Sequence, residues 1–139
     1  MKWVQATVVV DTPGRDLYDV TARIADVVGR SGVTTGLCNL FLQHTSASLL
    51  VQENADPDVL RDLLDWFERA APDADPRYRH VDEGPDDMSG HIRSALTQAS
   101  ITIPVDGGRL ALGTWQAVYL FEHRTQPHVR RIVVTVHGS

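Results

Sequence analysis

The first third of the chain alternates short apolar stretches with polar breaks. Residues 2–10 are rich in valine and predict a strand, which ends at a turn signal in residues 12–14. Apolar residues at helical spacing follow, so we predict a helix capped by Asp16 that runs to about Arg30. Residues 31–32 end this helix. Its apolar stripe consists of Leu17, Val20, Ile24, Val27 and Val28.

The second apolar stretch, residues 34–44, also predicts a strand. Its buried face, read with the two-residue period, contains Cys38, Leu40 and Leu42 and closes with His44. We therefore expect His44 at the end of a buried strand, at the rim of the core. Residues 47–53 are suited to a further strand.

The middle of the chain predicts two helices separated by a loop. Asp56 precedes a proline, which is the pattern of an N-cap followed by the first helical residue. The helix that follows has one buried stripe and ends near residue 71. Residues 72–87 contain three prolines and five aspartates and predict a loop, after which Asp86 and Asp87 cap a short helix to about Gln98. The buried stripe of the helix that follows Asp56 consists of Leu60, Leu63, Leu64 and Phe67.

The last third of the chain predicts strands only. We expect the last two to pair as a hairpin through the turn at residues 125–127. The series of strand, helix, two strands, two helices and four strands does not alternate regularly, so it predicts an α+β fold with an antiparallel or mixed sheet packed partly against itself. The four predicted strands are 101–105, 109–112, 114–123 and 129–137.

Composition narrows the class of protein. The 139 residues fit a single domain, and the hydrophobic content of 42% and charged content of 22% are ordinary for a globular protein. The net charge of -5 argues against nucleic acid or an anionic membrane as partner, although a small cationic phosphate site remains compatible. The single cysteine, Cys38, and the lack of a long apolar stretch or signal peptide lead us to expect a cytoplasmic protein.

Three histidines are candidates for a metal site: His44, His80 and His91. Their spacing matches no local zinc motif, so only the fold could bring them together. Neutral imidazoles suit a divalent transition metal, and an added carboxylate would suit Zn or Mg. The alternative is that these side chains are merely half-buried at the ends of strands and helices. The carboxylates considered are Glu53, Glu83 and Glu122.

A cluster of hydroxyl groups follows His44. Thr45, Ser46 and Ser48 have donors for phosphate oxygens, although hydroxyls in a turn also bond to their own backbone. The chain contains neither a GxSxG nucleophile motif nor a phosphate-binding P-loop, so we do not expect Ser46 to be an acylating nucleophile.

Three arginines, Arg124, Arg130 and Arg131, lie close to the last predicted turn. Their guanidinium groups suit phosphate, but charges of this kind also keep edge strands soluble.

Two further groups of polar residues have alternative interpretations. Asp56 is explained as a helix cap, but the adjacent Glu53 and Asn54 exceed what one cap requires. In the strand 114–123, Gln116 and Glu122 share a face with two apolar residues. If that face is buried, both polar groups need partners. Trp115 is on the other face, where we expect it in the core.

Several short strings in the chain occur together in one known family. They are HTSAS at 44–48, ENADP at 53–57, DM at 87–88, HI at 91–92, IPV at 103–105, LGTWQ at 112–116, Glu122, and RR at 130–131. In this combination the chain resembles, over essentially its whole length, the YjbQ-like family, also called the secondary thiamine-phosphate synthase family. It departs from that pattern at Gln98, where the family tends to have glycine, and at Ala55, where some members have cysteine.

The resemblance implies a single YjbQ-like domain over residues 1–139. That domain is a compact α+β fold with mixed or antiparallel β-layers in a sandwich-like arrangement and three helices, and it assembles as a homotrimer. The resemblance also implies a weak thiamine-phosphate synthase activity, which joins a hydroxymethylpyrimidine diphosphate to a thiazole phosphate and releases pyrophosphate. The implied polar pocket, compatible with a divalent metal, consists of His44, Ser46, Glu53, Asn54, Asp56, His80, His91, Gln116 and Glu122.

We expect these residues to divide into three roles in an enzyme that acts on a small phosphorylated substrate. The metal ligands are His44, His80, His91 and Glu122. The substrate or phosphate is bound by Thr45, Ser46, Ser48, Asn54, Gln116 and Arg131. The catalytic residues are His44, Glu53, Asp56 and His91. Two alternatives are a non-catalytic metal- or phosphate-binding module and a metal-dependent hydrolase.

Overall fold

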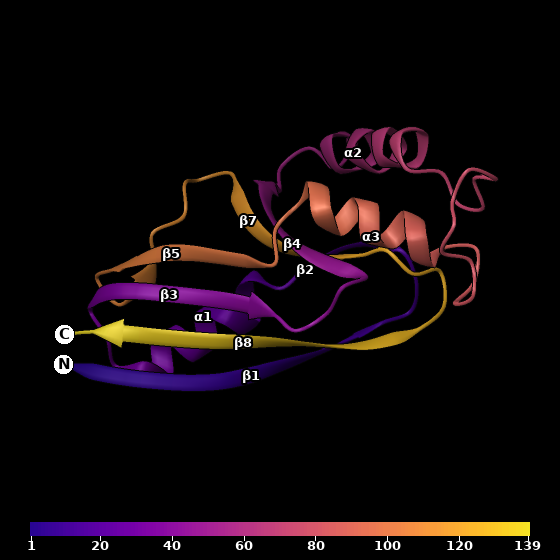
Figure 1. The fold of residues 1–139 in the computed structure, drawn as a ribbon. Coiled ribbons are helices and arrows are strands. Elements are labelled where there is room, and N and C mark those ends of the chain that lie inside the picture. The colour runs from indigo at the N-terminus through magenta and orange to yellow at the C-terminus, as the bar shows by residue number, and fades with distance from the viewer.

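Two antiparallel sheets, packed face to face, form the body of the protein in the computed structural model, which describes residues 1–139 (Figure 1). The larger sheet has the strand order β1-β8-β3-β5-β6, and the smaller has the order β2-β7-β4. The strands are β1 (Lys2–Thr12), β2 (Asp16–Asp19), β3 (Thr35–Leu42), β4 (Ala47–Glu53), β5 (Ser100–Asp106), β6 (Arg109–Leu110), β7 (Gln116–Glu122) and β8 (His128–Gly138). The predicted α+β sandwich is therefore confirmed.

The main core fills the space between the two sheets. Alternate residues of β3 and β8 face inward, as Leu40 and Val134 do, and they meet Leu49 and Leu120 from the smaller sheet. Each of these side chains is fully buried, and burial of one aliphatic side chain stabilises a fold by roughly 1.5–3 kcal/mol. The period-two pattern of the sequence arises from this contact between sheets.

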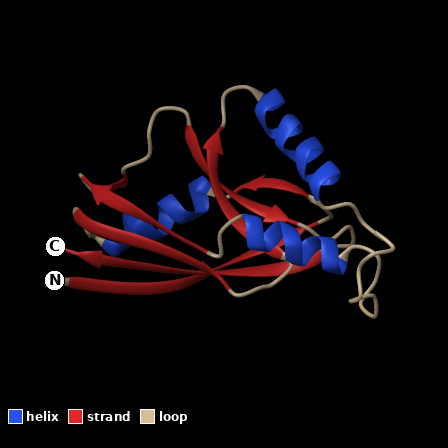
Figure 2. Cartoon of the chain, turned by 45° about the horizontal axis from the view of Figure 1, so that its top comes forward, coloured by secondary structure: helices blue, strands red, loops and turns tan.

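Three helices lie outside the strands (Figure 2): α1 (Thr21–Ser31), α2 (Pro57–Ala70) and α3 (Asp87–Leu96). Helix α1 packs against β1, β6 and β8 of the larger sheet and contributes Ile24 and Val28 to the main core. None of the three combines the length and the hydropathy that crossing a bilayer requires.

Helix α2 covers the outer face of the smaller sheet. Its Leu60, Leu64 and Phe67 pack against Tyr119 and Phe121 of β7, and the rings of Phe67 and Phe121 meet edge to face with 5.2 Å between their centroids. Strand β7 is thus buried on both faces, which explains why its sequence is almost continuously apolar.

Three segments carry the chain between the two sheets at the end opposite the termini (Figure 1). They are residues 13–15, 43–46 and 123–127, which we call the crossover segments. The register places Glu122, the last residue of β7, opposite Asp16 on one side and Ala47 on the other. The polar residues that follow these strands are therefore gathered at one end of the sandwich.

The predicted first helix begins too early. Residues Asp16–Asp19 form strand β2, and the helix starts only at Thr21. Leu17 and Tyr18 pair with Phe121 and Leu120 of β7, so contact with a distant strand overrides the helical spacing of the local sequence. The Asp16 carboxylate accepts a hydrogen bond from the Leu17 N–H and caps no helix.

Two predictions about the C-terminal strands are also wrong. Strands β7 and β8 form no hairpin, because the crossover segment 123–127 sends them to different sheets. Trp115 precedes β7 and is 62% exposed, because strand β7 starts only at Gln116.

The short helix α3 differs from its prediction at both ends. It starts at Asp87, and the Asp86 side chain makes no capping hydrogen bond because it binds Arg124 and Thr125. It ends at Leu96 rather than at Gln98, because the Gln98 carbonyl accepts a hydrogen bond from the Leu49 N–H at 2.6 Å.

The predicted cap of α2 is confirmed and can be tested. The Asp56 carboxylate accepts a hydrogen bond from the Asp58 N–H at 2.9 Å. We expect Asp56→Ala to lower the free energy of unfolding by about 1 kcal/mol in urea denaturation, and Asp56→Ser to restore most of it. Asp62→Ala, within the same helix, is the control. Equal stability of the Asp56→Ala and Asp62→Ala variants would contradict a capping role.

Candidate functional site

The structure brings together two imidazoles and one carboxylate at the start of α3. Asp87 and His91 are four residues apart, so both lie on one face of the helix, and His80 reaches them from the preceding loop. The Nε2 atoms of His80 and His91 lie 2.7 and 2.9 Å from the same Asp87 Oδ2. The three potential ligand atoms all lie within 4.8 Å of one another. We call these three residues the triad.

The triad fits a divalent transition metal. Tetrahedral ligands at zinc distances are about 3.3 Å apart, so the two N···O distances would widen by about half an ångström, and the two Nε2 atoms, which lie within 4.8 Å of each other, would move to the same spacing. Burial raises the pKa of Asp87, but hydrogen bonding from His80 and the neighbouring His91 and Arg124 outweigh it, so the pKa lies below its ordinary value and the carboxylate is ionised. The His80 and His91 side chains are 41% and 36% exposed, so an ion can reach them.

Arg124 fixes the orientation of the triad carboxylate. Its Nη1 donates to Asp87 Oδ1 at 2.7 Å, while its Nε donates to Asp86 Oδ1 at 3.2 Å and its Nη2 to the Glu83 carbonyl at 2.8 Å. Asp86 Oδ2 also accepts from the Thr125 N–H at 2.7 Å. Helix α3 and its preceding loop are thereby fastened to the crossover segment 123–127. A partner behind a ligating carboxylate of this kind strengthens metal binding.

The backbone of Arg124 also contacts a buried ion pair between Glu122 and Arg130. The two residues are 0% and 4% exposed, and the guanidinium binds both carboxylate oxygens, at 2.7 Å from Nε and 2.6 Å from Nη2. The Thr12 hydroxyl donates to Glu122 Oε1 at 2.6 Å, and the Arg124 N–H donates to Oε2 at 3.0 Å. Burial raises the pKa of Glu122, but these hydrogen bonds and the charge of Arg130 lower it below its ordinary value.

The ion pair extends to His44 and Ser46. Arg130 Nη2 donates to Ser46 Oγ at 2.9 Å, and Nη1 lies 3.4 Å from His44 Nδ1. His44 Nε2 accepts a shorter bond, 2.9 Å, from the Arg131 N–H. Burial and then the charge of Arg130 lower the pKa of His44, so its imidazole is neutral. A hollow of about 440 Å³ opens here, lined by His44, Thr45, Ser46 and Arg130 among others.

His44 lies in this second cluster and is not a member of the triad. Its Nε2 lone pair is already used by the backbone of Arg131, which leaves it poorly placed to bind a metal in this chain. The two clusters are nevertheless continuous, because Arg124 bonds to Glu122 through its backbone and to Asp87 through its side chain.

Two more predicted residues, Ser48 and Glu122, are already hydrogen-bonded to other side chains of the protein. Ser48 is 1% exposed and hydrogen-bonds with His123 at 2.9 Å and with Thr97 at 2.5 Å, so it is not available to a phosphate in this chain. Glu122 was expected as a metal ligand, but both of its oxygens are bound by Arg130.

Four more predicted residues lie at the opposite end of the smaller sheet. Strand β4 pairs with β7 from Ala47 opposite Glu122 to Glu53 opposite Gln116, a span of six residues or about 20 Å. Asp56 and Asn54 follow Glu53 directly, and the Gln116 side chain accepts from the Gly113 N–H. One chain therefore divides the expected pocket between two ends, with Glu53, Asn54, Asp56 and Gln116 away from the triad.

Asp87 and Arg124 were missing from the predicted site. A signal for Asp87 exists in the sequence, because a carboxylate and a histidine at positions i and i+4 of a helix face the same way. Arg124 was considered only as a possible phosphate-binding residue near the last predicted turn. Its contact with Asp87 depends on a crossover segment that the predicted hairpin excluded.

Comparison with known proteins identifies the family. A protein-family model described as "UPF0047 protein YjbQ-like" matches residues 6–139. The chain belongs to this family. It is 54% identical to the UPF0047 protein sll1880 of Synechocystis over 97% of this chain and 92% of the relative, and 42% identical to the UPF0047 protein YjbQ of Salmonella typhimurium over 99% of each.

Two solved structures share this fold over nearly the whole chain. A conserved hypothetical protein of Thermus thermophilus is 36% identical, with a TM-score of 0.82 over 92% of this chain and 97% of that one. A hypothetical protein of Aeropyrum pernix is 26% identical, with a TM-score of 0.89 over 98% of this chain and 99% of that one.

The Glu122–Arg130 pair leads to a stability prediction. In Glu122→Gln, an amide N–H group faces the donors of Arg130 or Arg124, and the buried guanidinium loses its counter-charge. We expect the free energy of unfolding to fall by roughly 3–5 kcal/mol, measured in urea at neutral pH. Asp26→Asn removes the exposed pair with Arg30 and, as the control, should cost less than about 1 kcal/mol.

The same pair should show itself in the pH dependence of stability. Because folding lowers the pKa of Glu122 below 4.5, its contribution is fully present above that pH and disappears as the pH falls through the folded value. The difference between wild type and Glu122→Gln should therefore be constant from neutral pH to about 4.5 and shrink in stronger acid. A difference that does not shrink in acid would contradict the assigned ionisation.

Proposed function

We propose that this YjbQ-like protein is a divalent-metal-dependent enzyme that acts on a small phosphorylated substrate. The observation that supports the proposal is the convergence of the potential ligand atoms of His80, Asp87 and His91 within 4.8 Å. Two imidazoles and one carboxylate favour zinc over magnesium, and three protein ligands leave a coordination position for substrate.

The specific reaction that we propose is that of a thiamine-phosphate synthase, as the resemblance implies. A carbon–nitrogen bond forms between the thiazole nitrogen and the pyrimidinylmethyl carbon, while the bond from that carbon to the pyrophosphate oxygen breaks. Charge then builds on the departing pyrophosphate. A metal ion bound at the triad would supply positive charge there.

The chain's own residues would bind the second anionic group. Thr45 is exposed in the lining of the 440 Å³ hollow, and Ser46 and Arg130 are buried in that lining. Arg131 follows Arg130 in β8 and is exposed, and its backbone N–H binds His44. Hydroxyl and guanidinium groups are suitable donors for phosphate oxygens. His44, held neutral, would position this part of the hollow through the hydrogen bond that its Nε2 accepts from the backbone of Arg131.

A homotrimer would bring the polar residues around Glu53 in one copy next to the triad of a neighbouring copy. Glu53, Asn54, Asp56 and Gln116 would then act on the substrate bound at the triad of a neighbouring copy, with Glu53 or Asp56 placed to orient the aminopyrimidine. The outer face of the larger sheet is a surface that such an assembly could cover. Its exposed apolar residues include Trp3, Leu37, Phe41 and Val129.

The second candidate function is a non-catalytic binding module. The observation that favours it is that the guanidinium groups of Arg124 and Arg130 are already bound to carboxylates of their own chain. Such a module would bind metal or phosphate without turnover.

Metal binding tests the first step of the proposal. We expect the purified protein to bind zinc in calorimetry. Loss of a residue that only hydrogen-bonds to a metal ligand typically weakens binding roughly 10–100-fold, and His91→Ala, which removes a ligand itself, should weaken it by more. His137→Ala, at the far end of β8, is the control and should bind as wild type does. Zinc binding that is equal in all three proteins would show that the triad is not the site.

Product formation tests the reaction itself. We expect the zinc-loaded protein to form thiamine phosphate from hydroxymethylpyrimidine diphosphate and thiazole phosphate. His91→Ala should lose both zinc and product, whereas His44→Ala should keep zinc and form at least about tenfold less product, as expected for a positioning group. Undiminished product from His44→Ala, or no product from wild type, would count against this reaction. Release of inorganic phosphate from simple esters would favour the hydrolase instead.

A mixing experiment tests the contribution of a neighbouring copy. Glu53→Gln should also lower product formation, although this residue is far from the triad of its own chain. Refolding a mixture of Glu53→Gln and His91→Ala chains should restore part of the activity, because some sites then combine two intact halves. Activity no higher than the average of the two variants would argue against shared sites.

A further inference from the structure

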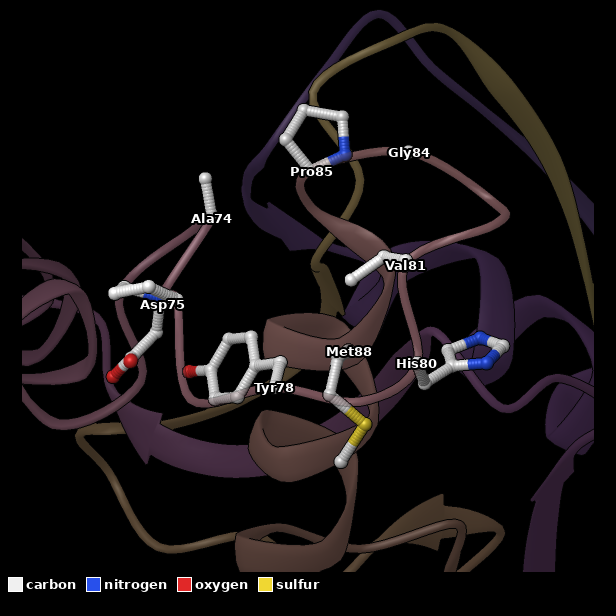
Figure 3. Close-up of a pocket in the computed structure, with 9 residues that line it drawn as sticks. Ala74, Asp75, Tyr78, His80, Val81, Gly84, Pro85 and Met88 are labelled. Atoms are coloured by element: carbon white, nitrogen blue, oxygen red, sulfur yellow. The ribbon is translucent and has the colours of Figure 1, made fainter.

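The loop before α3 encloses a hollow that no step of the proposed reaction uses. The Ala74 N–H donates to the Pro85 carbonyl at 2.8 Å, which closes residues 74–85 into a loop whose ends touch. Compact surface loops of this kind are frequently functional. The hollow has a volume of about 340 Å³ and lies over the first turn of α3 (Figure 3).

This hollow directly adjoins the triad. His80 belongs to both, and Met88, at its base, follows Asp87 in α3. Figure 3 shows the His80 ring turned away from the hollow, and that ring is the one whose Nε2 binds Asp87. A ligand in the hollow would therefore lie on one side of His80, with the triad on the other.

The lining of the hollow suits an uncharged, flat group. Tyr78, Val81, Pro85 and Met88 line it, and Val81 points into the space between them (Figure 3). The Tyr78 hydroxyl donates to the Pro72 carbonyl at 2.8 Å, which holds the phenol ring in place. Rings stack on phenol faces, and a methionine thioether makes favourable contacts with aromatic groups.

The one carboxylate in the lining does not favour a cationic ligand. Asp75 is bound by the guanidinium of Arg77, at 3.0 Å from Nε and 2.6 Å from Nη2. Its charge is therefore already compensated within the loop.

The backbone holds this hollow open under strain. Ala74 has a φ of 54°, and it is the one residue other than glycine with a positive φ in the chain. Such a conformation persists only where the surroundings enforce it, and strained residues cluster at ligand sites. At Ala74 the enforcing contact is the bond from its own N–H to the Pro85 carbonyl. The other side of the loop is fixed by the Arg124 bond to the Glu83 carbonyl and by the His80 bond to Asp87.

We infer that this hollow is the subsite for a single aromatic ring of a substrate whose phosphate is bound at the triad. A volume of about 340 Å³ is at the lower end for ligand pockets and suits one ring with small substituents. The inference rests on the proposed function for the place of the phosphate, but the ring subsite can be tested without it.

The methionine content of the chain offers a direct reporter. The protein has two methionines, Met1 and Met88, so methyl-labelled methionine gives two NMR signals. In the zinc-loaded protein, we expect phenyl phosphate to shift the Met88 signal until it saturates, and Met1, which is 92% exposed, to stay unchanged. Methyl phosphate has the same charge but no ring, and it should leave Met88 nearly unmoved.

Two variants of the same loop sharpen the test. Val81→Trp should fill the hollow and weaken phenyl phosphate binding by about tenfold or more, without changing zinc binding or the affinity for inorganic phosphate. Arg79→Trp adds the same indole to an exposed residue outside the hollow and should bind as wild type does.

The outcomes separate the subsite from the proposed function. Phenol, titrated without zinc, should also shift Met88, so failure of zinc binding would leave the ring subsite testable. The inference is overturned if phenol leaves Met88 unmoved, if methyl phosphate moves it as far as phenyl phosphate does, or if Val81→Trp binds phenyl phosphate like wild type.

Discussion

The buried ion pair between Glu122 and Arg130 is the interaction on which the end of the sandwich that carries the triad depends. It lies where the chain passes three times between the two sheets, so it links β1, β7 and β8 at one point through Thr12, the carboxylate and the guanidinium. Burying two charges is costly unless every oxygen and N–H group finds a partner. Here the carboxylate is bound by Arg130, Thr12 and the backbone of Arg124. The pair therefore fixes the relative positions of these three residues, and adds little net stability over an apolar pair of the same size.

The ion pair holds the triad in place through Arg124. Arg124 extends from the same crossover segment, binds Glu122 through its backbone, and holds both Asp87 and the carbonyl of Glu83 through its side chain. The loop that carries His80 and the start of α3 are thus both fastened to the crossover segment 123–127. Two histidines and one carboxylate therefore lie together at the start of α3, with one hollow beside them and a second hollow at His44 and Arg130.

Sequence reasoning recovered the fold class because the period-two and helical patterns directly reflect the core. It failed where distant contacts outweigh local preference, as at Leu17, whose helical spacing gives way to pairing with β7. For the site, His80 and His91 could be chosen by chemistry, but their common partner Asp87 had a sufficient local explanation as a helix cap. The distance between Glu53 and the triad depends on strand register, which no local pattern encodes.

The order of strands in the larger sheet also governs when the protein can fold. Strand β8 lies between β1 and β3 and pairs with both, although it follows all the other strands along the chain. Until β8 has emerged from the ribosome, β1 has no partner in the sheet and Glu122 lacks the guanidinium of Arg130. Completion of the larger sheet therefore waits for β8, and the emerging chain must keep a valine-rich strand unpaired until then.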